Sequence, residues 1–519
     1  MPLPLATLSV YGIIVLALFL IIYLHKRRRD RTQANPHSLP YPPGPRPLPI
    51  IGNLLDLARG NEIETYLQLY KTYGGVPTHS RLLFANGGLG DLVFLNVLGK
   101  KVLFVNSFQT AHHLFEKRSA NYSDRNHSPM LHELMGWDWT FGHMPYGERW
   151  KAHRRMFHRQ FQQSVAPAHW PVQRKEAHAL LRRILDSPDD LIDHLRHNAA
   201  SVIMNVTYGI KVAPKGDRFI TIAEKALAGM AEAANPGAFL VDFLPFLKHI
   251  PEWVPGAGFQ RKAREWKEAV YEMRDAPFET AMQAINAGRA SASFVSNLMG
   301  DLESAESKDS PEKDVELVKA CAGMSYAAGT ESTLSALSSF VLAIVCHPEV
   351  QAKGQEELDR VIGYTRLPDF SDRESLPYIT AIVKELLRWS PVAPLGLPHM
   401  ATNNDEYNGF FIPAGTTIVG NTWAILHNPI TFPNPSVFNP DRFLVSGPHK
   451  GSSTDLSPLD PLSVTFGYGR RICPGRYLAE AQLWISIACM LAVFNISPGV
   501  DESGRKINPE PAFTSGLIR

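Results

Sequence analysis

One ten-residue segment near the C-terminal end constrains this chain more than any other, because it joins a cysteine to a tightly turning backbone. The segment reads Phe-Gly-Tyr-Gly-Arg-Arg-Ile-Cys-Pro-Gly over residues 466–475, and the apolar residues 476–493 that follow it predict a helix. Its glycines let the backbone turn sharply and come close to a flat cofactor. A thiolate placed just before a helix is stabilised by free backbone N–H groups and by the helix dipole. We therefore expect Cys473 to bind a metal.

The cysteine content argues against disulfides. The chain of 519 residues contains only Cys321, Cys346, Cys473 and Cys489, with no Cys-x-x-Cys pair. Four cysteines in so long a chain form no disulfide framework and fit a reducing compartment. Hydrophobic residues make up 45% of the chain and charged residues 20%, as in ordinary globular proteins. The formal net charge is only +2, which gives no general basis for binding nucleic acid.

The N-terminal segment is expected to span a membrane. Residues 5–24 carry no charge, and such a run is long enough to cross about 30 Å of hydrocarbon as a helix. The basic cluster at 26–31 should stay on the cytoplasmic side. We expect residues 1–25 to be an uncleaved, single-pass signal anchor and residues 26–47 to be a basic and Pro-rich hinge. Residues 48–519 would form one domain that faces the cytosol from the endoplasmic reticulum membrane.

The body of the chain is expected to be mainly α with small β-sheets, an α+β fold in one compact unit. Residues 92–97 and 101–105 are short apolar runs of strand type, and most of the stretch 107–387 has helical periodicity. Residues 409–421 are expected to form a β-hairpin whose turn is Ile-Pro-Ala-Gly-Thr. The apolar segment 239–247 is either an ordinary core helix or a surface that dips into the bilayer.

Two predicted helices carry side chains that can act together. Glu385 and Arg388 are three residues apart, so they share one helix face and can form an ion pair. Trp150 and Arg154 are one turn apart on another helix. A second face of that helix is basic, with Lys151, Arg155, His158 and Arg159. That basic face is either a docking surface for an acidic protein or an ordinary solvated face.

A third predicted helix contains Ala-Gly-Thr-Glu-Ser-Thr at 328–333. Glycine weakens a helix by about 1 kcal/mol relative to alanine. The motif places the acid Glu331 beside the hydroxyl of Ser332, a pair that can relay protons through water. The alternative is that the hydroxyl bonds back to the backbone of its own helix.

The cysteine segment fits F-x-x-G-x-R-x-C-x-G at every fixed position and resembles the haem-ligand loop of the cytochrome P-450 family. The other motifs resemble the E-x-x-R, W-x-x-x-R and A-G-x-D/E-T motifs of that family, in the order that it requires. With the anchor and the Pro-rich hinge, the resemblance covers the whole chain. Ser332 departs from the pattern, which usually has Thr there, so the hydroxyl is kept and the methyl group is lost. The chain looks like fungal membrane-bound members of secondary metabolism and is similar to their tryptamine 4-monooxygenase group.

The resemblance implies a cytochrome P-450 fold with a single haem domain, and it assigns roles. Cys473 would be the axial ligand of the iron of haem b. Glu331 and Ser332 would deliver protons to dioxygen. A set of charged residues would hold the cysteine loop, namely Glu385, Arg388 and Arg442. Residues expected at the cofactor are Trp150, Arg154, Arg471, Phe466, His399, Arg125 and Gly475. Residues expected at the substrate pocket are Ala328, Val392 and Leu395.

The resemblance further implies a monooxygenase that inserts one atom of O2 into a lipophilic small molecule such as a terpenoid, polyketide or indole. Electrons would come from NADPH through a separate cytochrome P-450 reductase, with cytochrome b5 as a second candidate donor, because the chain has no dinucleotide fingerprint. Two alternatives remain. One is a haem-thiolate isomerase or dehydratase that needs no O2, and the other is a non-catalytic haem-binding membrane protein. The acid–hydroxyl pair disfavours both.

Overall fold

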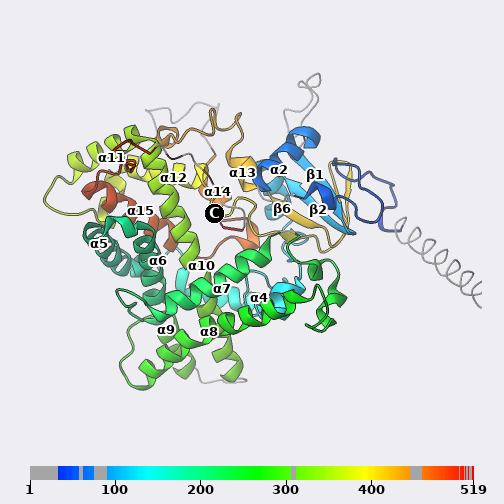
Figure 1. Ribbon diagram of the computed structural model, residues 1–519, viewed down its shortest axis with the longest axis horizontal. Helices are drawn as coiled ribbons and strands as arrows, with labels where there is room; N and C mark the ends of the chain where they lie inside the picture. Colours follow the sequence, from blue (N-terminus) through cyan, green and yellow to red (C-terminus); the bar gives the residue numbers. More distant parts are fainter. Residues whose placement is uncertain are drawn as a thin grey trace, which may run out of the picture.

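The computed structural model describes residues 33–57, 62–74, 91–235, 237–304, 311–444, 459–501 and 503–507, together with positions 509, 512, 517 and 518. The anchor predicted over residues 1–25 and the first part of the predicted hinge lie outside these residues. The described chain is mainly helical with two small sheets, which confirms the predicted fold class (Figure 1).

Helices make up most of the described chain, and local sequence explains several of their ends. Helices α5, α11 and α12 have Pro in the first turn, where the missing N–H costs no helical hydrogen bond. Helix α6 ends at Gly209, whose φ of 69° is left-handed. The α-helices are α2 (Glu62–Leu69), α3 (Phe108–His112), α4 (Glu148–Phe161), α5 (Trp170–Asp186), α6 (Leu191–Tyr208), α7 (Arg218–Ala234), α8 (Gly258–Asn286), α9 (Phe294–Ser304), α10 (Pro311–Cys346), α11 (Pro348–Val361), α12 (Pro377–Trp389), α13 (Thr422–Leu426), α14 (Leu462–Thr465) and α15 (Arg476–Val493).

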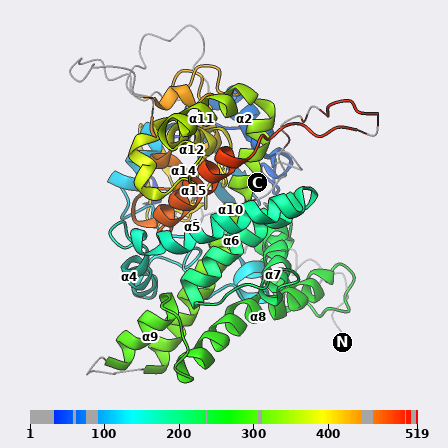
Figure 2. The same ribbon diagram turned by 90° about the vertical axis from the view of Figure 1, so that its left-hand side faces the viewer.

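Helix α10 passes through the middle of the helical part and packs along α6 (Figures 1 and 2). Thr207 of α6 and Ser325 of α10 share a hydrogen bond of 3.0 Å between their hydroxyl oxygens. Closer to the centre, a Cβ at Gly329 would lie 2.8 Å from Cγ1 of Ile203. Glycine at 329 is therefore required by the close approach of the two helices, which repays its low helix propensity.

Two of the described helices are long and apolar enough to cross a membrane, namely Glu312–Cys346 within α10 and the whole of α15. Both belong to the packed body of the protein, since 50% and 67% of their most apolar windows is buried. Their apolar composition is accounted for by burial in the core.

The larger sheet joins parts of the chain that are far apart in sequence. Its strand order is β1 (Leu92–Val97), β2 (Lys100–Val105), β6 (Thr417–Gly420) and β3 (His399–Met400). β1 and β2 form an antiparallel hairpin, β2 runs parallel to β6, and β3 is antiparallel to β6. The sheet lies beside α2, at the opposite side of the molecule from α5, α11 and α15 (Figure 1).

The hairpin predicted over residues 409–421 is wrong. Strand β5 (Phe410–Ile412) pairs with β4 (Asp405–Tyr407), whereas β6 belongs to the larger sheet. The turn of the actual hairpin is Asn408-Gly409, with φ of 50° and 78°. Two left-handed residues are what a type I′ turn needs, and Asn-Gly is its commonest sequence. The Pro-Ala-Gly-Thr turn instead carries the chain from the small sheet to the large one.

The apolar segment 239–247 is not a core helix. It forms two short 3-10 turns, η8 (Leu240–Asp242) and η9 (Pro245–His249). Val241 is buried, but Phe246 is 63% exposed and Trp253 nearby is 82% exposed. Of the two expectations for this segment, the core helix is excluded.

Candidate active site

The cysteine loop is a series of tight turns that end at α15. Gly467 and Gly469 have φ of 76° and 53°, so both need the left-handed freedom of glycine. The N–H of Cys473 donates to the carbonyl of Phe466 at 2.8 Å. Gly475, the N-cap of α15, has φ of −87°, which any residue can adopt. All three glycines therefore lie in or beside turns, but only the first two need the left-handed conformation.

The sulfur of Cys473 lies among positive and donating groups. Burial raises the pKa of this thiol, while a hydrogen bond from the backbone N–H of Gly475 and the charges of Arg154 and Arg476 lower it. Such donors favour the thiolate form that metals bind. All four cysteines of the chain are free, so Cys473 is available as a ligand.

Three arginines lie in or near the cysteine loop and form no ion pair with a carboxylate of the described residues. Burial, together with the positive charge of Arg471, lowers the pKa of Arg125 to about 9. Burial likewise lowers the pKa of Arg471 to about 10. Within the described residues, neither of these nor Arg154 forms an ion pair. Their hydrogen bonds go to backbone carbonyls: Arg125 to Gly142, Leu397 and Pro398, Arg154 to Ile472, and Arg471 to Ser123, Phe141 and Met144. This cluster suits a dianionic ligand.

Aromatic and imidazole groups surround the arginines. Trp150 of α4 is buried, and the guanidinium of Arg471 lies over its ring at 4.5 Å from the centroid. His399 of β3 pairs its Nδ1 with the carbonyl of Tyr122 at 2.6 Å. Burial lowers the pKa of His399 well below its usual value, and Arg125 and Arg471 lower it further. With no anionic group bound, these effects favour the neutral form of His399, whereas a carboxylate beside the ring would favour its protonated form. Phe466 packs against the core formed by α12 and α15.

The acid and hydroxyl of α10 do not bond to each other in the described structure. Ser332 donates its hydroxyl to the carbonyl of Ala328 at 2.6 Å, which is the back-bonding that was weighed against a relay. Burial raises the pKa of Glu331, the charge of Arg196 lowers it, and that of Glu224 raises it again. Glu331 thus faces α6 and α7, whereas Ser332 lies beside Ala328.

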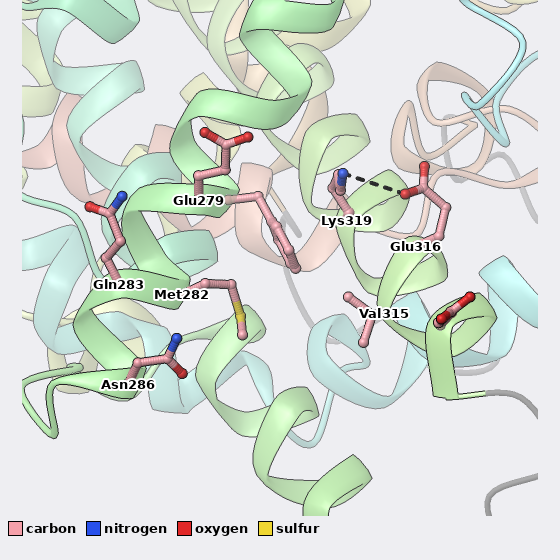
Figure 3. Close-up of a pocket in the computed structure, with 9 residues that line it drawn as sticks. Glu279, Met282, Gln283, Asn286, Val315, Glu316 and Lys319 are labelled. Atoms are coloured by element: carbon pink, nitrogen blue, oxygen red, sulfur yellow. Dashed lines mark ion pairs between the residues drawn. The ribbon is translucent and has the colours of Figure 1, made fainter.

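The residues expected at a substrate pocket are all at least partly accessible. Ala328 is exposed although it lies in the middle of α10. Val392 and Leu395 follow α12 and are half-buried. They border two different hydrophobic clusters, Val392 the one around α12 and Leu395 the one around β1 and β2. A separate pocket of about 590 Å³ lies between α8 and α10 and contains none of the predicted site residues (Figure 3).

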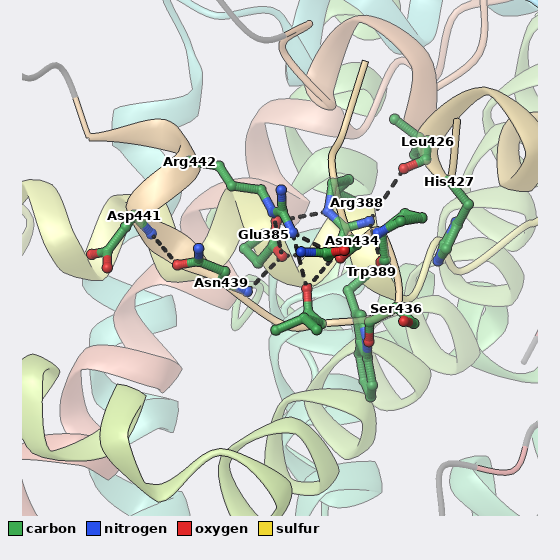
Figure 4. A network of polar contacts seen from close by, with 12 residues as sticks. Glu385, Arg388, Trp389, Leu426, His427, Asn434, Ser436, Asn439, Asp441 and Arg442 are labelled. Atoms are coloured by element: carbon green, nitrogen blue, oxygen red, sulfur yellow. Dashed lines mark hydrogen bonds and ion pairs between the residues drawn. The ribbon is translucent and has the colours of Figure 1, made fainter. Parts of the chain in front are cut away.

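Glu385, Arg388 and Arg442 meet in one buried polar network (Figure 4). Arg388 binds both carboxylate oxygens of Glu385, at 2.7 and 2.8 Å, and neither side chain is exposed. Arg442 lies 3.4 Å from Glu385 and donates to the carbonyl of Asn434 at 2.9 Å. Arg388 also reaches backbone carbonyls of the segment before Arg442, at Leu426, Pro435 and Val437. The network ties α12 to the segment 434–442.

Two residues near the loop were missed by sequence reasoning. Arg476 lies in the first turn of α15, and its place three residues after Cys473 could have revealed it. Glu116 accepts a hydrogen bond from the N–H of Gly469 at 2.5 Å. The two are 353 positions apart, and no local pattern could have indicated that contact.

The residues of the site fit haem. The sulfur of Cys473 has a backbone donor and nearby cations. Arg125, Arg154 and Arg471 are partly or fully buried and form no ion pair within the described residues, although Asp124 acts on Arg125 and Arg471 as a nearby negative charge. Haem would supply both a metal for the thiolate and two carboxylates for the arginines.

Comparison with known proteins gives matches over nearly the whole chain. The family model described as cytochrome P-450 matches residues 42–516. A cytochrome P-450 monooxygenase of Armillaria gallica is 43% identical over 483 residues, which cover 93% of this chain and 90% of the relative. Cytochrome P-450 monooxygenase 98 of Postia placenta is 42% identical, with 92% and 88% covered. Tryptamine 4-monooxygenase of Psilocybe cyanescens is 38% identical, with 92% and 90% covered.

Proposed function

The chain belongs to the cytochrome P-450 family and is a monooxygenase of that family; from this premise we propose that Cys473 is the axial ligand of haem b and that the enzyme oxidises a lipophilic small molecule. The observation that carries the proposal is the single buried neighbourhood of a donor-stabilised cysteine sulfur and three arginines that form no ion pair within the described residues. When bound, haem supplies the activation of dioxygen, of which one atom enters the substrate and the other leaves as water.

The chain holds the cofactor from two sides. Cys473 would bind the iron, while the N–H of Gly475 and the charges of Arg154 and Arg476 favour its thiolate form. Phe466, which packs against the neighbouring core, would shield the sulfur from water. Arg125, Arg154, Arg471, Trp150 and His399 would hold the propionates. The network of Glu385, Arg388 and Arg442 ties α12 to the segment 434–442 and would thereby help to keep the loop in place.

Proton delivery is assigned to α10. The raised pKa of Glu331 lets this carboxyl keep its proton to a higher pH than an exposed glutamate would. The hydroxyl proton of Ser332 is committed to Ala328, so its oxygen lone pairs are free to accept a hydrogen bond from a water. Because Glu331 faces α6 and α7, a chain of waters would have to join its carboxyl to that hydroxyl. The names of the relatives favour this monooxygenase role over the isomerase and the non-catalytic alternatives.

The substrate is a lipophilic metabolite that meets Ala328, Val392 and Leu395. Ala328 presents an accessible apolar surface one turn before Ser332. The tryptamine 4-monooxygenase relative makes indoles a reasonable first class to screen, beside terpenoids and polyketides. A place in fungal secondary metabolism is part of this proposal.

The enzyme is proposed to work on the endoplasmic reticulum membrane, anchored by residues 1–25 with its catalytic domain in the cytosol. The exposed side chains of Phe246 and Trp253 support contact of the body with the bilayer. Electrons come from NADPH through a separate reductase, with cytochrome b5 as a second donor. The exposed basic residues of α4 support the docking surface, namely Arg155, His158 and Arg159. Nucleic acid is not an expected partner.

The test is the carbon monoxide spectrum of the reduced protein, with Cys473→Ser as the variant. A strongly red-shifted Soret band in the wild type that is absent in C473S would support thiolate-ligated haem. An unshifted band in the wild type, or one that the variant leaves unchanged, would remove the basis of the proposal. With the band established, lipophilic compounds can be screened for shifts of the haem spin state.

A further inference from the structure

A short helical turn far from the cysteine loop in sequence makes a charged hydrogen bond to it. The turn is η4 (His113–Lys117), a π-helical turn that continues α3. Oε1 of Glu116 accepts the backbone N–H of Gly469 at 2.5 Å. In the described part of the chain Glu116 forms no ion pair, so its carboxylate is available to the loop. Hydrogen bonds to ionised acceptors are shorter and stronger than neutral ones.

The backbone of the loop is pressed against the same turn. A Cβ at Gly469 would lie 2.3 Å from the carbonyl oxygen of Phe115 and 3.5 Å from Oε2 of Glu116. The ring of Phe115 stacks on that of Tyr468 with 5.3 Å between centroids. The contacts of Phe115, the residue before Glu116, therefore fix where the loop meets η4 and hold the N–H of Gly469 close to the carboxylate.

Gly469 opens the turn that leads to the metal ligand. It begins the 3-10 turn η12 (Gly469–Arg471), whose first N–H groups have no partner inside the turn. The N–H of Ile472 then donates to the carbonyl of Gly469 at 3.2 Å, directly before Cys473. Glu116 thus satisfies a free donor at the start of the turn, as an N-cap side chain does for a helix.

The same turn also carries Arg471. Its guanidinium binds the carbonyls of Ser123 and Met144 at 2.7 Å each. A loosened start of η12 would therefore move both the cysteine and an arginine of the anionic site. No other described side-chain carboxylate bonds to the backbone of residues 466–475.

We propose that Glu116 is a positioning residue that holds the cysteine loop through the N–H of Gly469 and thereby keeps Cys473 bound to the haem iron. The inference rests on the proposed role of Cys473. It assigns to Glu116 no contact with haem, substrate or the reacting atoms.

The test compares variants of the full-length protein loaded with haem b, by the carbon monoxide spectrum of the reduced form. Glu116→Ala removes the acceptor, and the red-shifted band should convert to the unshifted form about tenfold faster than in the wild type. Glu116→Gln keeps an acceptor oxygen at the same reach and should stay within about twofold of the wild type. Lys117→Ala, an exposed neighbour on the same turn, should have no effect.

A second control separates positioning from general loss of stability. Val295→Ala opens a cavity in α9, where the side chain is fully buried and belongs to another hydrophobic cluster. If V295A and E116A lower Tm by the same amount, V295A should still convert the red-shifted band at the wild-type rate, whereas E116A should convert it faster. If E116A yields no folded protein, Glu116→Asp takes its place in the comparison. Aspartate is shorter by one methylene, so its carboxylate lies farther from the N–H of Gly469, and the band should convert about threefold faster than in the wild type.

Each outcome bears on one proposal. A wild type without the red-shifted band overturns the proposed function itself. A wild type with the band, and an E116A or E116D variant that loses it no faster than K117A and V295A, overturns the role of Glu116. A wild-type-like E116Q together with faster conversion in Glu116→Met supports it, because methionine fills similar space without the acceptor oxygen.

Discussion

Replacing Glu385 by glutamine should destabilise the protein, because it leaves a buried positive charge without its partner. Glu385 and Arg388 are both 0% exposed and are joined by hydrogen bonds of 2.7 and 2.8 Å. Glutamine has nearly the same shape, but its amide N–H group would face a guanidinium that can only donate. The change therefore removes the counter-charge and one acceptor without changing the packing volume.

The expected size follows from burial. Removing one partner of a buried ion pair costs about 3–5 kcal/mol. An unfolding entropy of about 2.1 cal/mol/K per residue amounts to roughly 1.1 kcal/mol/K for the 519 residues. E385Q should therefore lower Tm by about 3–5 °C. The measurement is thermal unfolding followed by far-UV circular dichroism, at one scan rate for all variants.

An exposed pair of the same spacing provides the control. Lys151 and Glu148 lie 2.7 Å apart at positions i and i+3 of α4, with side chains 39% and 81% exposed. Glu148→Gln should leave Tm unchanged within error, because solvent screens exposed pairs. The double variant Glu385→Leu with Arg388→Met should be more stable than E385Q, since the fully buried guanidinium is removed with its partner and the remaining Arg442 is 12% exposed. Equal Tm values for E385Q and E148Q would refute the reasoning.

Three further predictions concern the loop, an acid-sensitive histidine and a link between surface segments. Gly469→Ala should abolish the red-shifted carbon monoxide band, because φ of Gly469 is 53° and the new Cβ would lie 2.3 Å from a carbonyl oxygen. Gly475→Ala should keep the band, because φ of Gly475 is −87° and the new Cβ would have no neighbour outside the adjacent residues nearer than 4.0 Å. Equal bands in the two variants would contradict this prediction. Burial lowers the pKa of His143 from 6.5 to about 3. Between these two pH values the imidazole is protonated in the unfolded state but not in the folded state, so the free energy of unfolding decreases as the pH falls. His143→Gln should flatten the dependence of Tm on pH between about pH 4 and 7, and an unchanged slope would count against it. Asp242→Ala removes the acceptor of two hydrogen bonds, one of 2.7 Å from the hydroxyl of Ser128 and one of 3.0 Å from the N–H of Met130. Hydrogen exchange of the amides of residues 128–134, measured by mass spectrometry, should accelerate about tenfold. Unchanged protection of these amides would exclude the link.

The family and the general fold followed from sequence, because their signals are local. The cysteine loop is ten consecutive residues, and the pair of Glu385 and Arg388 lies within one helical turn. The mainly helical body and the strands at 92–97 and 101–105 also followed from periodicity, and the match to the family over residues 42–516 confirms the identification. The hairpin was misplaced, although the Asn-Gly turn that forms it is itself a local signal.

The sequence is enough to propose which residues take part in the chemistry, whereas their meeting in space depends on tertiary packing. The grouping of Arg125 with Arg471 brings together segments 346 positions apart by sequence number, and it depends on how the loop before α4 packs against the cysteine loop. Whether the hydroxyl of Ser332 bonds back to its own helix was open until the side chains were placed on α10. The contact of Glu116 with Gly469 has no local signature at all. Sequence patterns reach one or two turns along the chain, whereas these contacts are set by the packing of elements that the chain brings together only when it folds.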